Sequence, residues 1–430
     1  MKKVLIITYY WPPAGGVPVQ RWVKMARYLH EFGWEPVIYT VENGEQAVLD
    51  HTLAATLPAN LEVIRRPIWE PYSAYRNLLG MRQDEKINAA FLQEKKKKSW
   101  LQELAVWIRG NFFIPDARRF WIKPSVSFLS DYLRKHPVDA IISTGPPHSM
   151  HMIALGVKQQ TGIPWIADFR DPWTNIDYYT SLHLSRWADK KHHALEKMVI
   201  SGADKVVTVS KSWAADFASM YHRHVEVVTN GFDTHDYPEQ PIKLDTSFTL
   251  HHVGMINKAR NPEVLWKAIA RLCAQHTEFR QDVQIAFTGK VDHSVLDMIE
   301  QYGLSAHVKQ YGHVDHPVAI AHMRAAGVLL LLVNDAQDIK GRVPAKLFEY
   351  MAAQRPIVAI GDPEGDAAAI LTETGCGVMH GLQDEEGVYQ TLETCYQQWK
   401  SGTLQQTRMA PEKYTRRALE GQYAQLLDAL

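Results

Sequence analysis

The chain has 430 residues, which is too long for one ordinary domain and favours two. Its 46% hydrophobic and 22% charged residues are typical of a globular protein with a large core. Lys plus Arg and Asp plus Glu both number 47, so net charge argues neither for nor against nucleic acid, and we expect no nucleic-acid partner.

Cysteines and apolar runs bound the class of protein further. Cys273, Cys376 and Cys395 have no paired spacing, so we expect neither a disulfide framework nor a zinc site. No apolar run approaches the ~18 residues that span a bilayer. The N-terminal run resembles a signal peptide for five residues only, and we interpret it as a buried first strand. We therefore expect a soluble cytoplasmic protein, with peripheral contact at the inner face of the cytoplasmic membrane left open.

Strand and helix signals alternate along the first half of the chain. Short apolar runs predict strands at 3–10, 35–41, 139–144, 164–168, 205–210 and 225–230, and periodic segments between them predict helices, the first at 19–33. The pattern fails at 62–127, which is rich in aromatic residues and cations, and we interpret that segment as an insertion. This alternation predicts a parallel sheet with helices on both faces.

The alternation restarts after a polar stretch with two prolines at 234–247, which we interpret as a linker. Strands are predicted at 248–254, 283–289, 308–312, 328–333 and 357–360, with helices between them. We therefore predict an α/β protein of two doubly wound, Rossmann-like domains facing across a cleft. The first spans 1–235, joined by a C-terminal helix at 414–430 that packs back on it, and the second spans 236–413. Ligands bind at the carboxyl ends of such strands.

A glycine turn follows the first strand. Gly15 and Gly16 let the backbone approach a ligand, and Pro18 suits the first turn of the next helix. Such a helix start offers N–H groups and a positive dipole end to an anion. The turn is neither G-x-G-x-x-G nor a P-loop, so a plain tight turn remains an alternative.

Two motifs of the second half suit a nucleoside diphosphate. Gly254 follows a strand, and Lys258 and Arg260 on the same loop suit a diphosphate, with two solvated charges as the alternative. Lys346 sits in the first turn of a helix beginning at Pro344, where the dipole disfavours a cation unless an anion is bound.

Glu349 lies one turn further along the same helix, on the same side as Lys346. Its carboxylate could accept hydrogen bonds from the two hydroxyls of a ribose. A surface ion pair between Lys346 and Glu349 is the alternative. We also assign the neighbouring Val343, Pro344 and Leu347 to this donor-binding segment.

These features, in this order, carry a family resemblance. With "PPAGGV", "TNGFD" and "KLFEYMAAQRPIVA", the chain resembles the family 4 glycosyltransferases of the GT-B fold, and "ADFRDPW" is similar to a bacterial surface-polysaccharide subgroup. The resemblance implies retaining, metal-independent transfer from a nucleotide-sugar donor on the second domain to a glycan or lipid-linked acceptor on the first. It implies that Gly16 meets the donor phosphate, Arg260 with Lys258 clamps the diphosphate, and Glu349 binds the ribose.

The sequence departs from the family pattern at two positions. Gly341 replaces the first Glu of the E-x₇-E motif, and Met255 replaces an arginine usual after the strand-loop glycine. How the hydroxyls of the donor sugar are held is therefore open. A sugar-nucleotide-binding protein that has lost catalysis, or a GT-B epimerase, are the alternatives. A GT-B phosphorylase is disfavoured because no lysine stands in an obvious cofactor-linking context.

Two loops of the first half should face the cleft. His148 opens a helix after the strand at 139–144, and Asp168, Arg170 and Asp171 end the next strand. We list these four as candidate catalytic residues, with His148 or Asp171 orienting the acceptor or donor sugar. A structural Asp–Arg pair and a helix-start hydrogen bond by His148 are the alternatives. The histidines form no metal-binding motif, so we expect no metal and no cofactor besides the nucleotide sugar.

The insertion combines lysines with tryptophans. Four lysines at 95–98 precede Trp100, Leu101, Leu104, Trp107 and Ile108 at helical spacing. Tryptophan and lysine on an amphipathic helix suit an anionic membrane surface, here through residues 95–121. A core-facing helix after a solvated charge run is the alternative.

Overall fold

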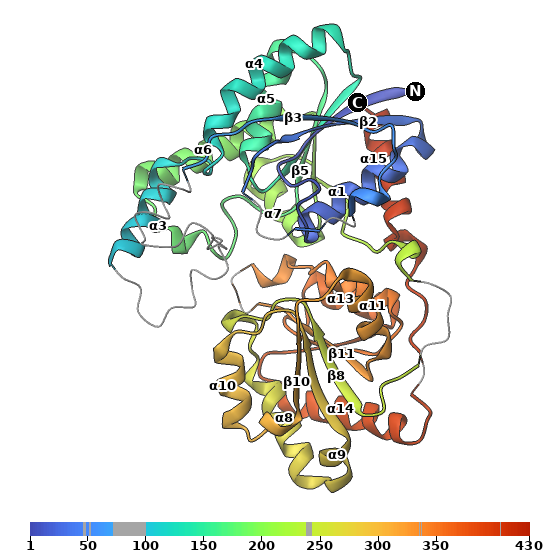
Figure 1. Cartoon of the computed structure of the whole chain (residues 1–430). Helices are drawn as coiled ribbons and strands as arrows, with labels where there is room; N and C mark the ends of the chain where they lie inside the picture. Colours follow the sequence, from blue (N-terminus) through green and yellow to red (C-terminus); the bar gives the residue numbers. More distant parts are fainter. Residues whose placement is uncertain are drawn as a thin grey trace. The chain divides into compact units, whose positions relative to one another are not determined.

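The structure is a computed structural model, and it describes residues 1–45, 49–50, 53–71, 100–237, 243–334, 336, 338–404 and 406–430. The chain forms two compact units (Figure 1). Unit 1 comprises Met1–Thr229 and Arg416–Leu430, and unit 2 comprises Asn230–Thr415. Each is built around its own parallel sheet.

Unit 1 holds a seven-stranded sheet in the order β3-β2-β1-β4-β5-β6-β7, with every pair parallel. Its strands read as short apolar runs because helices cover both faces. The strands are β1 (Lys2–Ile7), β2 (Trp34–Val41), β3 (Glu62–Arg66), β4 (Ala140–Gly145), β5 (Trp165–Phe169), β6 (Lys205–Thr208) and β7 (Glu226–Val227).

The helices of unit 1 cover two cores, one on each face of the sheet. Leu5 and Ile7 of β1 enter one core and Val4 and Ile6 the other, as the two-residue period of a strand requires. The second core also takes in Tyr423 of the C-terminal helix. The helices are α1 (Val17–Tyr28), α3 (Trp100–Phe112), α4 (Arg119–Lys135), α5 (Ser149–Thr161), α6 (Arg186–Gly202), α7 (Lys211–Tyr221) and α15 (Arg416–Asp428).

Unit 2 repeats the plan with a six-stranded parallel sheet in the order β10-β9-β8-β11-β12-β13. Its strands are β8 (Phe248–Val253), β9 (Val283–Thr288), β10 (Val308–Gly312), β11 (Val328–Leu332), β12 (Ile357–Ile360) and β13 (Gly377–His380). Its helices are α8 (Glu263–Gln275), α9 (Thr277–Asp282), α10 (His293–Gln301), α11 (His316–Ala325), α12 (Lys346–Ala352), α13 (Asp366–Thr374) and α14 (Glu385–Lys400).

The predicted α/β class with parallel sheets is confirmed, and two strands were missed. β3 lies inside the segment taken as an insertion, where it pairs in parallel with β2 at the edge of the sheet. Its signal was weak because only Val63 and Ile64 are apolar, and polar edge strands with cations are a common protection against aggregation. β13 was also missed, and α4 begins inside the expected insertion. Residues 72–99 of that segment and 238–242 of the linker lie outside the described residues.

Candidate functional site

In unit 2 the strand order reverses between β8 and β11, which is the topological switch point of the sheet. Ligands of open parallel sheets bind at the carboxyl ends of the strands beside such a point. Gly254 follows β8 directly, and Asn334 follows β11. The predicted donor-binding segment, which runs into α12, follows β11 along the chain. The residues of this site are therefore assembled by topology as well as by local sequence.

Gly254 allows a close approach that no other residue would. Its φ is +105°, and its N–H donates to the carbonyl of Thr288 at 2.7 Å. A Cβ added to Gly254 would lie 2.9 Å from Lys346 Nζ, and one added to Gly289 would lie 2.7 Å from the Gly254 carbonyl oxygen. Both glycines are therefore needed where the ends of β8 and β9 meet the lysine.

Lys346 is the central cation of this site. His252 Nδ1 lies 2.9 Å from the carbonyl of Leu330, so that nitrogen carries the proton and Nε2 can accept from Lys346 Nζ at 3.2 Å. Burial, followed by the charge of Arg260, lowers the pKa of Lys346 to about 7, although Glu349 opposes both effects. Burial and then Lys346 also hold the pKa of His252 well below 6.5, so this ring is neutral.

Arg260 is held beside Lys346 by two hydrogen bonds. Its Nε donates to Asn334 Oδ1, and its Nη1 donates to the carbonyl of Met255 at 3.4 Å. The charge of Arg260 acts on the pKa of Lys346, so the two predicted cations are close enough to serve one anion. Lys258 is exposed and makes none of these contacts in the described part of the chain.

Glu349 lies in the first turn of α12 with its side chain half-buried, and its backbone carbonyl accepts from the Tyr237 hydroxyl at 3.1 Å. The helix begins at Lys346, two positions after the expected Pro344. Val343 and Leu347 were expected at the donor site, but their side chains are buried in the core of unit 2. Only their backbone could contact a donor, because Val343 packs into this core just before α12 begins and Leu347 lies on the buried face of the helix.

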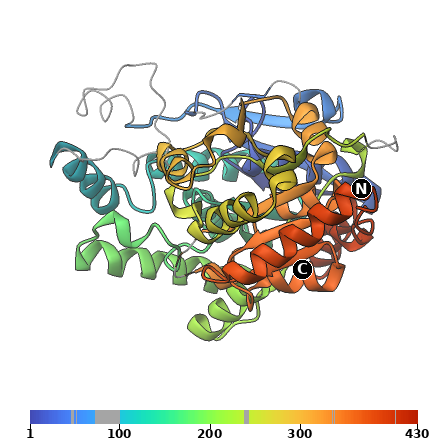
Figure 2. The same cartoon turned by 90° about the horizontal axis from the view of Figure 1, so that it is seen from below.

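Unit 1 has its own switch point, between β1 and β4. A cavity of about 310 Å³ lies where Tyr10 follows β1 and the loop Pro146–His148 follows β4. Seven of its lining residues come from the segment predicted to be an insertion, on α3 and the connection to α4: Val106, Arg109, Gly110, Phe113, Pro115, Asp116 and Arg118. Both Figure 1 and Figure 2 show α3 beside α6. The rest of the wall includes Trp173, Tyr178, Tyr179, Ser181, Leu182 and His192.

His148 forms part of the wall of this cavity and is 6% exposed. Its ring stacks on Trp173 with the centroids 4.5 Å apart and 1° between the planes. Burial lowers the pKa of His148 well below 6.5, and His151, His192 and Arg170 lower it further, so the ring is neutral. Neither ring nitrogen has a hydrogen-bond partner among the described residues, and His148 makes no side-chain hydrogen bond at the start of α5, so the alternative of a helix-start hydrogen bond is excluded.

Asp168 lies inside unit 1, surrounded by hydrogen-bond donors from other elements. Its carboxylate is fully buried and accepts from Tyr423 at 2.7 Å, Thr144 at 2.9 Å and Trp22 at 3.2 Å, with Arg21 Nη2 at 3.4 Å. These contacts tie α1, β4 and α15 to the sheet, so Asp168 has a structural role, and the catalytic role expected for it stays a prediction.

Of the two carboxylates next to Arg170 in the sequence, that of Asp168 pairs with Arg21 of α1. Arg170 donates to the carbonyl of Pro146 and so joins the loop after β5 to the one after β4. Burial lowers the pKa of Arg170, and Asp171 is the first of the charges that oppose this. Asp171 therefore faces Arg170, and its role toward a substrate stays a prediction.

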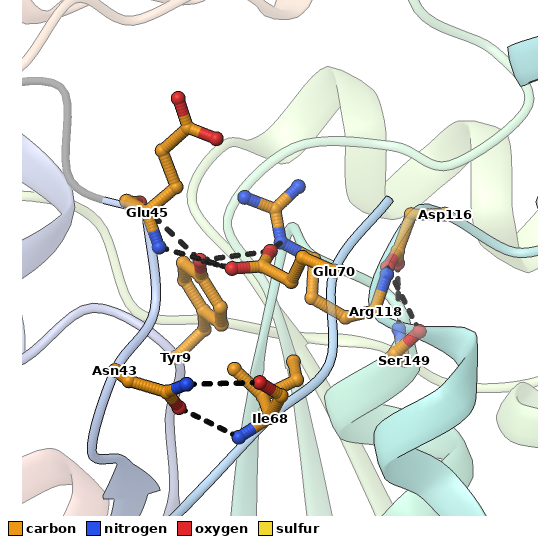
Figure 3. A network of polar contacts seen from close by, with 8 residues as sticks. All are labelled: Tyr9, Asn43, Glu45, Ile68, Glu70, Asp116, Arg118 and Ser149. Atoms are coloured by element: carbon orange, nitrogen blue, oxygen red, sulfur yellow. Dashed lines mark hydrogen bonds and ion pairs between the residues drawn. The ribbon is translucent and has the colours of Figure 1, made fainter. Parts of the chain in front are cut away.

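A polar network positions the insertion against the loops that carry the site (Figure 3). Asp116 accepts from the N–H of Ser149 at 2.9 Å and from its hydroxyl at 2.8 Å, so it caps α5. Arg118 Nε lies 3.0 Å from Glu70, and the guanidinium stands 4.4 Å above the ring of Tyr9. Figure 3 shows the two terminal nitrogens of Arg118 directed away from Glu70.

Sequence reasoning missed Asp116 and Arg118 as site residues. Only the sequence "PDARR" between two aromatic pairs marked them, and such a pattern has no specific chemistry. Gly15 and Gly16 stand at the start of α1, where Gly16 has φ +94° and its carbonyl accepts from the N–H of Val19 at 3.0 Å. This glycine turn suits a close backbone approach, and its role toward a donor stays a prediction.

The described residues form neither a candidate metal site nor a candidate membrane span. They contain no group of three or more His, Cys, Asp or Glu side chains placed to hold a metal ion. None of the helices in the described part of the chain is both long and apolar enough to cross a membrane.

Two family models match this chain. The family model described as glycosyl transferase 4-like domain matches residues 16–232, and that described as glycosyl transferases group 1 matches residues 247–398. A search of curated proteins found no match.

Solved structures with similar folds cover nearly the whole chain. Sucrose-phosphate synthase from Thermosynechococcus elongatus is 14% identical over 100% of this chain and 99% of its own, with a TM-score of 0.62. WaaG, a glycosyltransferase involved in lipopolysaccharide biosynthesis, is 14% identical over 99% and 95%, with a TM-score of 0.54. The lipopolysaccharide outer core galactosyltransferase WaaB is 13% identical over 100% of both chains, with a TM-score of 0.59. At these identities the likeness establishes the fold, which is GT-B.

Proposed function

The chain belongs to the glycosyltransferases, by the family models that match residues 16–232 and 247–398, and from this premise we propose the reaction. In this proposal, the enzyme moves a sugar from a nucleoside diphosphate sugar to a glycan or lipid-linked acceptor in surface polysaccharide biosynthesis. The observation that carries the proposal is the convergence of Gly254, Arg260, Lys346 and Glu349 at the switch point of unit 2. Two cations and one carboxylate around a glycine suit a diphosphate joined to a ribose.

Each of these groups has a role in the proposed transfer. Lys346 and Arg260 bind the diphosphate and stabilise the negative charge that grows on it as the bond to the sugar breaks. The oxygen of an acceptor hydroxyl bonds to the anomeric carbon on the face from which the diphosphate leaves, and the hydroxyl proton passes to the departing phosphate oxygen. This step retains the anomeric configuration and needs no side-chain nucleophile, metal or further cofactor. Glu349 accepts hydrogen bonds from the ribose hydroxyls.

Calorimetric titration with UDP, GDP and ADP and their sugar conjugates tests this donor site. We expect micromolar binding of one nucleotide, and Glu349→Ala should weaken it about 10- to 100-fold, because a hydrogen bond to a charged group contributes about 1.5–3 kcal/mol. Glu278→Ala, which removes an exposed carboxylate from α9 at the opposite edge of the sheet, is the matched control and should leave the affinity unchanged. Unchanged affinity in Glu349→Ala would remove this residue from the donor site.

Two rival functions are separated by the fate of the donor. Gly341, which stands where the family has the first Glu of its motif, is buried in a short turn before α12 and offers no carboxylate. A binding protein without catalysis would bind the nucleotide sugar and never consume it. An epimerase would invert the sugar in the absence of any acceptor, which NMR of the donor would reveal. Transfer to an added acceptor with the configuration retained is the result that we expect.

The insertion favours a membrane surface as a further partner, with the protein held peripherally at the cytoplasmic face. Aromatic and aliphatic side chains that are exposed to solvent gather there: Trp69, Leu104, Trp107, Phe112 and Phe120. Several touch one another, with ring centroids 4.9 Å apart for Trp69 and Phe120 and 5.7 Å for Trp107 and Phe112. Exposed aromatic rings beside arginines suit the interface of an anionic bilayer.

Sedimentation with liposomes tests this partner. The wild-type protein should pellet with vesicles containing phosphatidylglycerol, and the double variant Trp107→Ser with Phe112→Ser should bind several-fold less. Val318→Ser removes an exposed apolar side chain from α11 of unit 2 and should bind like the wild type. Absence of binding by the wild type to anionic vesicles would eliminate the membrane from the proposal.

A further inference from the structure

We propose that the cavity of unit 1 is the acceptor subsite and that it selects a saccharide bearing an anionic group, which Arg109 of α3 recognises. This inference rests on the proposed glycosyl transfer and specifies its acceptor. A carboxylate, as in a uronic acid, and a phosphate share the chemistry that Arg109 would recognise. The specificity would then reside in a segment that is inserted into the first domain.

The cavity has the place and size of a ligand site. It opens at the carboxyl ends of β1 and β4, beside the switch point of the sheet. Its volume of about 310 Å³ lies at the lower end of the range for small-molecule sites. Phe113, Trp173 and Tyr179 supply aromatic surface, against which the carbon-bound face of a sugar ring can pack.

His148 indicates a hydroxylated ligand. The ring is neutral and buried, so one nitrogen is a donor and the other an acceptor, and neither has a partner in the part of the chain that the structure describes. Buried polar groups are nearly always hydrogen-bonded, so an unpaired imidazole in a cavity wall is a sign that the partner is a ligand. A sugar hydroxyl both donates and accepts and can therefore satisfy either nitrogen. An aliphatic ligand would leave both unsatisfied.

Arg109 indicates the anionic group. The other charged side chains of the wall have partners within the protein: Arg118 pairs with Glu70, and the carboxylate of Asp116 accepts hydrogen bonds from Ser149. Among the described residues no acidic side chain pairs with Arg109, which is half-buried. A guanidinium in this setting binds a carboxylate or a phosphate bidentately.

The last turn of α3, which carries Arg109, is held in place by the segment that leads into α6. Asn111 Oδ1 accepts from the N–H of Ser185 at 2.7 Å, at the start of α6. Gly110 packs so closely that an added Cβ would lie 2.8 Å from Leu184 and 2.9 Å from the carbonyl of Leu182. These contacts fix the last turn of α3 and therefore the position from which Arg109 reaches the cavity.

The experiment compares three probes that differ in charge: methyl glucoside, the methyl glycoside of glucuronic acid and glucose 6-phosphate. Their binding to the full-length protein is measured by ligand-observed NMR. We expect at least one anionic probe to bind about tenfold more tightly than methyl glucoside, which is about 1.4 kcal/mol, because only the anionic probes form charge-assisted hydrogen bonds with Arg109. Preference for glucuronide over phosphate, or the reverse, identifies which anion the site takes.

Arg109→Ala should abolish this preference while leaving the affinity for methyl glucoside unchanged. Arg134→Ala, which removes an exposed cation of α4 outside the cavity, is the matched control and should keep it. Equal binding of all three probes, or a preference that survives Arg109→Ala, would overturn the inference.

The same variants are titrated with the nucleotide that the wild type binds. Unchanged nucleotide binding with altered probe preference supports the acceptor subsite. If the wild type binds no nucleotide, the proposed function fails on its own, whereas the selectivity of the cavity is still read from the probes.

Discussion

Replacing Lys346 by methionine is expected to lower the affinity for a nucleoside diphosphate sugar by about 10- to 100-fold. The substitution keeps the length of the side chain and removes one charge-assisted contact, which contributes about 1.5–3 kcal/mol. His252 should remain in place, because its Nδ1 still donates to the carbonyl of Leu330. Titration calorimetry at pH 7 measures the loss.

The pH dependence of binding identifies Lys346 as the cause. Its pKa of about 7 in the free protein is below the usual 10.5, because the group is buried and Arg260 is near. A bound diphosphate favours the charged form and raises this pKa, so the complex holds more protons than the free protein above pH 7. Binding at pH 8 should therefore take up a proton, and affinity should fall as pH rises.

Calorimetry at pH 8 in two buffers of different ionisation enthalpy measures this uptake. A nucleotide sugar is the ligand of choice, since its diphosphate has no group that titrates near pH 8. His252 contributes nothing, because its pKa lies well below 6.5. Proton uptake that persists in Lys346→Met would show that another group is responsible.

Replacing Asp168 by alanine is expected to destabilise unit 1 by about 3–5 kcal/mol, because it leaves the Arg21 guanidinium buried without its carboxylate. The Tyr423 hydroxyl would lose its acceptor as well, so α15 should loosen first. Amide hydrogen exchange at 416–428 and in α1 reports this directly, with the peptides of unit 2 as the internal reference.

Asp131→Ala is the matched control for this prediction. Asp131 lies on α4 of the same unit and its carboxylate is exposed, paired only with the exposed Arg134, so its loss should change hydrogen exchange little. A variant of Asp168 that keeps wild-type exchange yet loses transfer activity would support the catalytic role that the sequence suggested.

Local pattern was enough to identify most of the sheets. An apolar run of four to six residues between two periodic segments is what a strand covered on both faces requires, and β1, β4 and β11 are clear cases. β3 escaped because an edge strand needs few apolar residues. Lys346 of the donor site was also identified from local pattern. It stands at a helix start, where the helix dipole disfavours a cation, and that conflict is visible in the sequence.

Tertiary structure decided the rest, because it depends on which distant residues come together. Asp168 and His148 look equally suited to catalysis in the sequence. In the structure, the carboxylate of Asp168 is enclosed by Arg21 and Tyr423. The ring of His148 lies at a cavity, and its two nitrogens have no hydrogen-bond partner among the described residues. His252 became a site residue only because β8 lies beside β11 and meets Lys346. The sequence by itself determined the alternation of strands and helices, the family and the residue types at the strand ends. Packing decided which charged side chains pair with other groups inside the protein and which, like Arg109, line a cavity. The reason is that the partners of a side chain come from the whole fold.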